Sequence, residues 1–145
     1  MHRRLDWFLL AWFGYWLALF SATHIPLPPP GEIIEPQLPW DKFVHFGGYS
    51  VLTFLALLSL SRSRRLRWTH YAGVFLLFAT YGMIDELTQS FVPRRECDFW
   101  DWVADIFGTV LAIFVFSIGS RWKRSKGNAA NSPPTESAAT ELEDA

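Results

Sequence analysis

The chain has 145 residues, of which 50% are hydrophobic and 17% aromatic, and its formal net charge is −1. This length fits one domain, and the single Cys97 excludes an intramolecular disulfide and a cysteine-rich metal site. The sequence has no internal repeat and no nucleic-acid-binding signature, so we expect no nucleic-acid partner.

Four apolar segments predict an all-α fold, an integral membrane four-helix bundle, because a membrane-spanning helix needs about 20 apolar residues. The first segment, at about 6–22, is rich in Trp and Phe but short for a span. A secretory signal peptide is the alternative for it. The other spans are expected at 43–60, 68–91 and 100–120.

The connecting segments differ in composition. Residues 23–40 are proline-rich and should be extended. Residues 61–67, SRSRRLR, predict a tight basic loop, and Pro93 should break the helix before the last turn. Residues 127–145 lack an apolar period and read as a disordered tail. One transmembrane domain is therefore expected at 1–126, followed by this tail.

The basic residues are unevenly distributed between the two sides of this bundle. Cytoplasmic loops carry an excess of Lys and Arg, so both termini are predicted to be cytoplasmic. Ten basic residues fall on the predicted inner side and three on the outer side. The inner ones are Arg3, Arg4, Arg62, Arg64, Arg65, Arg67, Arg121, Lys123, Arg124 and Lys126, and the outer ones are Lys42, Arg94 and Arg95.

With this topology the unusual polar residues gather at the outer ends of three helices. Charged groups facing lipid are costly, up to about 2.5–3.5 kcal/mol for an Asp at the centre of a helix, so these residues should turn inward. Arg94 or Arg95 is expected to fold over them as a partner. The residues are Asp41, Lys42 and His45 in the second helix; Asp85, Glu86 and Gln89 in the third; and Asp98, Asp101 and Asp105 in the fourth.

Their spacing predicts which of them share a helix face. Asp85 and Gln89 are four residues apart, and Asp98, Asp101 and Asp105 follow an i, i+3, i+7 pattern. Glu86 lies about 100° around the helix from Asp85 and should serve a different contact. The glycines at 47, 48 and 108 are expected to allow close helix approach.

Three motifs in order resemble the VanZ-like family of bacterial membrane proteins. The first resembles an Asp-Lys-x-x-His pattern, the second an Asp-Glu-x-x-Gln pattern with a Pro-containing turn ending in Arg, and the third an Asp followed by Asn and Gly on one helix. The matching residues are Asp41, Lys42, His45 and Tyr49; Asp85, Glu86, Gln89, Phe91, Pro93 and Arg95; and Asp101 and Gly108.

This resemblance covers about 41–108 and, with the first helix, most of the expected ordered chain. Asp105 stands where the family pattern leads us to expect Asn, which argues against a role that needs a neutral amide. Membership implies a small polytopic envelope protein, and the founding member is associated with resistance to the glycopeptide teicoplanin. The resemblance therefore implies a location and a phenotype but no reaction.

Three classes of function fit a polar pocket at the outer face. An enzyme acting on a lipid-linked envelope substrate would use His45 with Asp85 or Glu86 for acid–base chemistry, and Arg95 to hold a phosphate or carboxylate. A binder would hold an envelope lipid, wall precursor or glycopeptide. A non-catalytic accessory or scaffold subunit of an envelope complex is the third class, and transport would require oligomers.

The expected ligand-binding residues surround the three candidate acid–base groups. A divalent metal held by His45 and the acids is an alternative that the residue types allow. No compact spacing such as H-E-x-x-H accompanies the single imidazole of His45, so no metal site is predicted, and the sequence identifies no cofactor. The expected binding residues are Asp41, Lys42, Gln89, Arg94, Arg95, Asp98, Asp101 and Asp105.

Overall fold

The structure is a computed structural model that describes residues 7–26 and 40–130, and every regular element in these ranges is an α-helix. The helices are α1 (Trp7–Thr23), α2 (Trp40–Ser63), α3 (Trp68–Gln89) and α4 (Phe99–Ala130). The prediction of an all-α chain with four helices is therefore confirmed.

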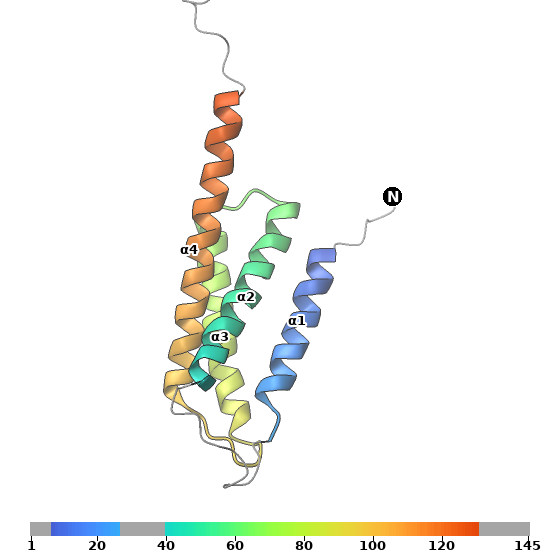
Figure 1. The fold of residues 1–145 in the computed structure, drawn as a ribbon, viewed down its shortest axis with the longest axis vertical. Coiled ribbons are helices and arrows are strands. Elements are labelled where there is room, and N and C mark those ends of the chain that lie inside the picture. The colour runs from blue at the N-terminus through green and yellow to red at the C-terminus, as the bar shows by residue number, and fades with distance from the viewer. Residues whose placement is uncertain (1–6, 27–39, 131–145) are drawn as a thin grey trace, which may run out of the picture.

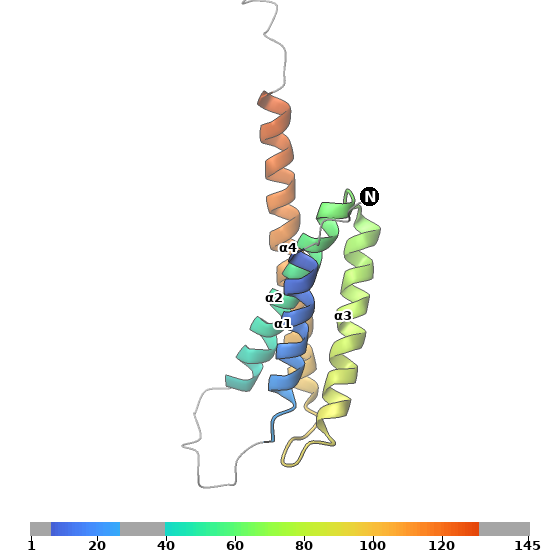
Figure 2. The same ribbon diagram turned by 90° about the vertical axis from the view of Figure 1, so that its right-hand side faces the viewer.

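The four helices lie side by side, and α4 extends beyond the others at its C-terminal end (Figures 1 and 2). The most extensive packing is between α2 and α4; α3 packs on α4, and α1 packs on α2. Consecutive helices run antiparallel (Figure 1). For α2, α3 and α4 this follows from the short loops between them. The ends of α1 and α3 therefore meet the beginnings of α2 and α4 at one end of the bundle, which we call the loop end after the loop of residues 90–98.

The core of the bundle is apolar and closely packed around two glycines. A Cβ added to Gly108 of α4 would overlap with the backbone carbonyl of Phe46 of α2, and one added to Gly48 would lie 2.7 Å from Leu19 Cδ1. Both glycines therefore allow close helix approach, whereas a Cβ added to Gly47 would have no atom within 4 Å, so this part of the prediction is wrong. The buried apolar cluster consists of Leu19, Tyr49, Leu52, Leu57, Val74 and Phe78.

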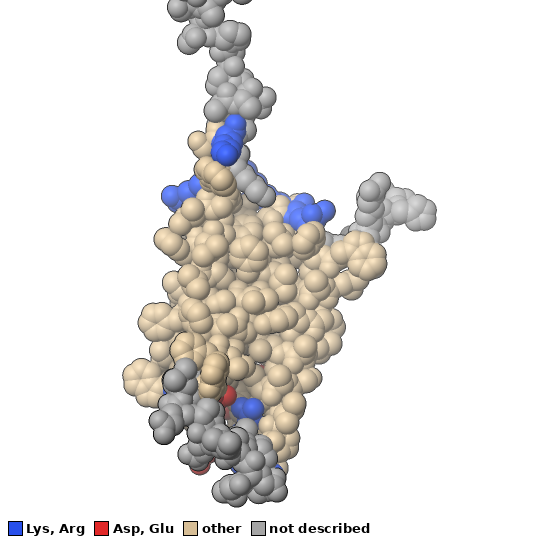
Figure 3. Space-filling view, viewed as in Figure 1, with Lys and Arg blue, Asp and Glu red and all other residues tan. Residues whose placement is uncertain are grey.

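The exterior of the bundle carries many large apolar side chains, such as Leu76, Phe107 and Phe114, each more than 60% exposed. On the face seen in Figure 3, the charged side chains lie toward the two ends of the bundle and the zone between them carries none. Within the described ranges, two helical segments, Trp40–Ser63 and Phe99–Trp122, are long and apolar enough to cross a membrane; α1 is apolar but shorter.

Several helix boundaries differ from those expected, three of them in ways that bear on the site or on the predicted tail. α2 begins at Trp40 rather than at residue 43, so Asp41 and Lys42 lie in its first turn. α3 ends at Gln89, four residues before Pro93. α4 continues to Ala130, four residues into the predicted tail, because each residue added to an existing helix gains a backbone hydrogen bond. The rest of that tail, the first six residues and most of the proline-rich segment lie outside the described residues.

The contact at Gly108 predicts a large effect of one methyl group. Gly108→Ala should lower the free energy of unfolding by about 1–3 kcal/mol, the usual cost of overpacking, because α2 and α4 would have to separate. Gly119→Ala on the same helix is the matched control: its added Cβ would meet nothing within 4 Å, so it should be neutral or stabilising. Thermal unfolding in detergent compares the two variants, and equal melting temperatures would contradict the close approach.

Candidate functional site

Six polar side chains from three helices meet at the loop end of the bundle, and each is at most 4% exposed. We call them the buried polar cluster. They come from the beginning of α2, the end of α3 and the beginning of α4. The cluster consists of His45, Asp85, Glu86, Gln89, Asp101 and Asp105. The structure thus brings together six of the residues that the sequence analysis places in one pocket.

His45 is the contact between the three helices. Its Nδ1 lies 3.1 Å from Asp105 Oδ1 of α4 and 3.6 Å from Glu86 Oε1 of α3. Because Asp105 offers an acceptor, Nδ1 carries the proton of this hydrogen bond. Asp105 therefore fixes the orientation of a ring that α2 alone would leave free to rotate.

Glu86 holds the loop of residues 90–98 against α3. Its Oε2 accepts a hydrogen bond of 3.0 Å from the backbone N–H of Asp98, and its Oε1 accepts one of 3.2 Å from Gln89 Nε2. The separate contact expected for Glu86 is therefore present. Because both of its oxygens accept hydrogen bonds from the protein, Glu86 has a structural role besides any chemical role.

Asp85 and Gln89 share a face of α3, as their spacing predicts. Gln89 Nε2 donates to Asp85 Oδ2 at 3.2 Å, and Arg95 Nη1 donates to Gln89 Oε1 at 3.2 Å. Arg95 also donates from Nε to the carbonyl of Ile25 at 3.0 Å. Arg95 thus folds over the cluster as expected, but these two bonds go to an amide and a carbonyl instead of a carboxylate. The amide relays the contact because Gln89 lies between Arg95 and the deeper Asp85.

Lys42 joins α2 to the beginning of α4. Its Nζ donates to Asp98 Oδ2 at 2.6 Å and to Asp101 Oδ1 at 2.8 Å. Asp98 precedes the first residue of α4, is 41% exposed, and also accepts the Trp100 N–H at 2.8 Å. The hydrogen bond from Lys42, followed by that from Trp100, lowers the pKa of Asp98 below its ordinary value.

The sequence analysis does not identify His24 as part of this region. The residue directly follows α1; its Nε2 lies 3.0 Å from Thr88 Oγ1 and its Nδ1 lies 3.9 Å from Asp85 Oδ1. Its ring also stacks on Phe20. The sequence feature that could have identified His24 is its position at the end of an apolar segment, at the same predicted depth in the membrane as Asp85. That signal alone also fits an interfacial residue.

An open depression of about 430 Å³ lies above the cluster. Gln89 and Asp101 reach it from within the bundle, and Asp41, Arg94, Arg95 and Asp98 also line it. Asp41 is exposed, and Arg94 has a φ of 65°, in the left-handed region. The three candidate acid–base groups, His45, Asp85 and Glu86, are buried beneath this lining.

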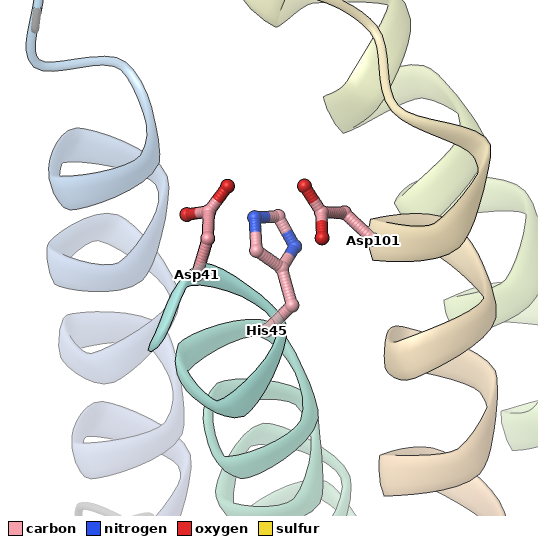
Figure 4. Close-up of side chains that lie close together, drawn as sticks. All are labelled: Asp41, His45 and Asp101. Atoms are coloured by element: carbon pink, nitrogen blue, oxygen red, sulfur yellow. The ribbon is translucent and has the colours of Figure 1, made fainter. Parts of the chain in front are cut away.

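Among the residues that the structure describes, two overlapping groups of side chains have metal-ligand chemistry. In each group one ligand atom per residue lies within 4.8 Å of the others: Asp41, His45 and Asp101 in one group, and His45, Glu86 and Asp105 in the other. Figure 4 shows the first group, with the two carboxylates on either side of the imidazole ring. The candidate ligands in each group come from different helices. The sequence therefore contains no compact metal-binding motif that would have identified them.

Comparison with known proteins gives one family. Residues 5–120 match the family model described as VanZ/LLP1. No significant match is found among curated proteins or among solved structures.

The contacts of Glu86 predict local rather than global destabilisation. Glu86→Ala removes the acceptor of the Asp98 N–H, and leaving a donor without its partner costs about 1–3 kcal/mol. Amide exchange in residues 90–98 should therefore accelerate roughly 10- to 100-fold, since about 1.4 kcal/mol corresponds to a factor of ten. Hydrogen–deuterium exchange by mass spectrometry measures this on the full chain.

Glu96→Ala provides the control, because Glu96 is an exposed carboxylate on the same loop. It should leave the exchange of the loop unchanged. Equal exchange in the two variants would show that Glu86 does not anchor the loop.

Proposed function

The chain belongs to the VanZ/LLP1 family, and on this premise we propose that it is a multi-pass protein of the bacterial inner membrane with both termini in the cytoplasm. The loop end then faces outward. Its depression binds the polar head of an amphipathic envelope ligand, such as a lipid-linked wall precursor or a glycopeptide antibiotic.

Helix length and charge support the membrane part of this proposal. α3 has 22 residues and rises about 33 Å at ~1.5 Å per residue, enough for a hydrocarbon core of about 30 Å. α1 has 17 residues and is short for a straight span, so flanking residues must complete it. The basic residues at the end opposite the loop end favour a cytoplasmic position for that end.

The observation that carries the binding function is the lining of the depression. Its volume of about 430 Å³ suits a ligand head group, and Arg95 and Asp101 offer both signs of charge. His45, Asp85 and Glu86 are at most 1% exposed and bond to other members of the cluster. Direct acid–base attack on a ligand in the depression would require these groups to be uncovered, so the geometry favours binding over catalysis.

The native cysteine allows the orientation to be tested without engineering a reporter loop. Cys97 is exposed at the loop end and is the single cysteine of the chain. A membrane-impermeant maleimide should therefore label it on spheroplasts before permeabilisation. In a Cys97→Ser, Ser125→Cys variant the thiol lies near the other end of α4, so labelling should require permeabilisation. The reverse pattern would invert the topology and place the depression in the cytoplasm.

A second test identifies the ligand. Envelope lipids and wall precursors that co-purify with the wild type should include a species that Arg95→Gln depletes at least about tenfold, because one charge-assisted hydrogen bond is worth about 1.5–3 kcal/mol. Mass spectrometry measures this depletion. Arg121→Gln, at the opposite end of α4, is the matched control and should retain the species.

Mass spectrometry also distinguishes the binder from the enzyme and from the accessory or scaffold subunit. A cellular lipid profile that changes with the wild type and reverts in Asp85→Asn at matched abundance would indicate an enzyme instead of a binder. Absence of any enriched species, with the profile unchanged, would leave the accessory or scaffold role and contradict the binding proposal.

A further inference from the structure

The imidazole of His45 has one nitrogen with a partner and one without. Nδ1 lies 3.1 Å from Asp105 Oδ1, so in the neutral ring the lone pair is on Nε2. Nε2 is buried and has no hydrogen-bond partner among the described residues. Buried polar atoms normally have a partner, and the side chain, 1% exposed, has little access to water.

Two carboxylates flank this ring. Asp41 lies four residues before His45 and therefore on the same face of α2, and Asp101 reaches across from α4. One ligand atom from each of the three residues lies within 4.8 Å of the others (Figure 4). Ligands bound to one Zn²⁺ at about 2.0–2.2 Å can be at most about 4.4 Å apart. The observed spacing is thus close to that of a metal site, and the exposed Asp41 can adjust most easily.

We propose that His45 Nε2, Asp41 and Asp101 bind one divalent transition-metal cation, Zn²⁺ or Mn²⁺, at the floor of the depression. One imidazole with two carboxylates is a mixed nitrogen and oxygen ligand set, in which the imidazole suits Zn²⁺ and the carboxylates suit Mn²⁺. Asp105 positions the ligand, because a carboxylate on the second ring nitrogen fixes the tautomer and makes the first a better donor.

The charge of the surroundings favours a cation at this position. Lys42 Nζ pairs with Asp98 Oδ2 and with Asp101 Oδ1. The other oxygen of Asp101, Oδ2, is therefore left for a metal. Arg95 bonds to Gln89 and Ile25, and Asp105 Oδ2 is a further buried oxygen without a hydrogen-bond partner. A divalent cation would offset this excess of buried carboxylates.

Three protein ligands at the floor of an open depression leave coordination positions for water or for a ligand oxygen. The metal would therefore lie where the head group of a bound molecule can reach it. The inference does not rest on the proposed function, because it is tested with Zn²⁺ and Mn²⁺ alone. Failure to find an envelope ligand would leave it standing.

The first experiment is a titration of the full-length protein in nanodiscs after treatment with a chelator. The wild type should bind one equivalent of Zn²⁺ or Mn²⁺ by calorimetry and by elemental analysis. Asp41→Asn should weaken binding at least tenfold. Glu96→Gln removes an exposed carboxylate at the same end of the bundle and should bind like the wild type.

Asp41→Asn keeps the test valid if a change at the buried His45 prevents folding. Binding of less than one equivalent by the wild type, or equal affinity in Asp41→Asn, would overturn the proposal. Such a result would favour a protonated His45 that donates from Nε2 to the same carboxylates.

A second readout tests the ligand directly. Pulsed EPR of the Mn²⁺ form should detect coupling to one imidazole nitrogen, which His45→Gln abolishes and His70→Gln, at the far end of α3, retains. Asp105→Asn should weaken the affinity about 10- to 100-fold, as is usual for a group that orients a metal-binding histidine, but keep the coupling. Coupling that persists in His45→Gln would overturn the assignment of His45.

Discussion

The contact of His45 with Asp105 and Glu86 joins three helices at one level, and the other polar contacts of the loop end are arranged around it. The distances are 3.1 Å and 3.6 Å from the same ring nitrogen. Charged side chains on an apolar helix can avoid lipid only by meeting one another inside the bundle. Once His45 fixes Asp105, the beginning of α4 is aligned with the beginning of α2 and the end of α3.

Two further hydrogen bonds fix the loop of residues 90–98 relative to these helices. Glu86 binds the backbone N–H of Asp98, and Lys42 binds its side chain. Asp98 in turn accepts the N–H of Trp100 in the first turn of α4. The loop is therefore held by side chains from both neighbouring helices, and the shape of the depression above it follows from the cluster below.

The sequence predicts that these polar side chains meet, because the prediction depends on the spacing of residues within each helix. The spacing of Asp85 with Gln89, and of Asp101 with Asp105, places each pair on one helix face, and short loops make the helices neighbours. Whether Arg95 reaches a carboxylate or the amide of Gln89 depends on how deeply each side chain is buried in the bundle, and the spacing in the sequence does not give this. The contact of His24 with Thr88 joins residues 64 positions apart and depends on how α1 packs. Four helices could be counted from hydropathy, but the extra turns of α4 could not, since charged residues interrupt the apolar pattern without ending a helix.

Asp105 connects the departure from the family pattern with the chemistry of the site. An Asn at this position could also accept the His45 Nδ1–H, but it would bring no charge. A carboxylate on Nδ1 fixes the ring tautomer and strengthens the donation of Nε2 to a metal. A protonated ring would need an acceptor at Nε2, and the nearby acceptors are Asp41 and Asp101, the same carboxylates that would bind a cation. Both states would place a positive charge between these two carboxylates, and they differ in whether a proton or a metal ion provides it. The open depression above the carboxylates would give the proposed metal ion access to the ring.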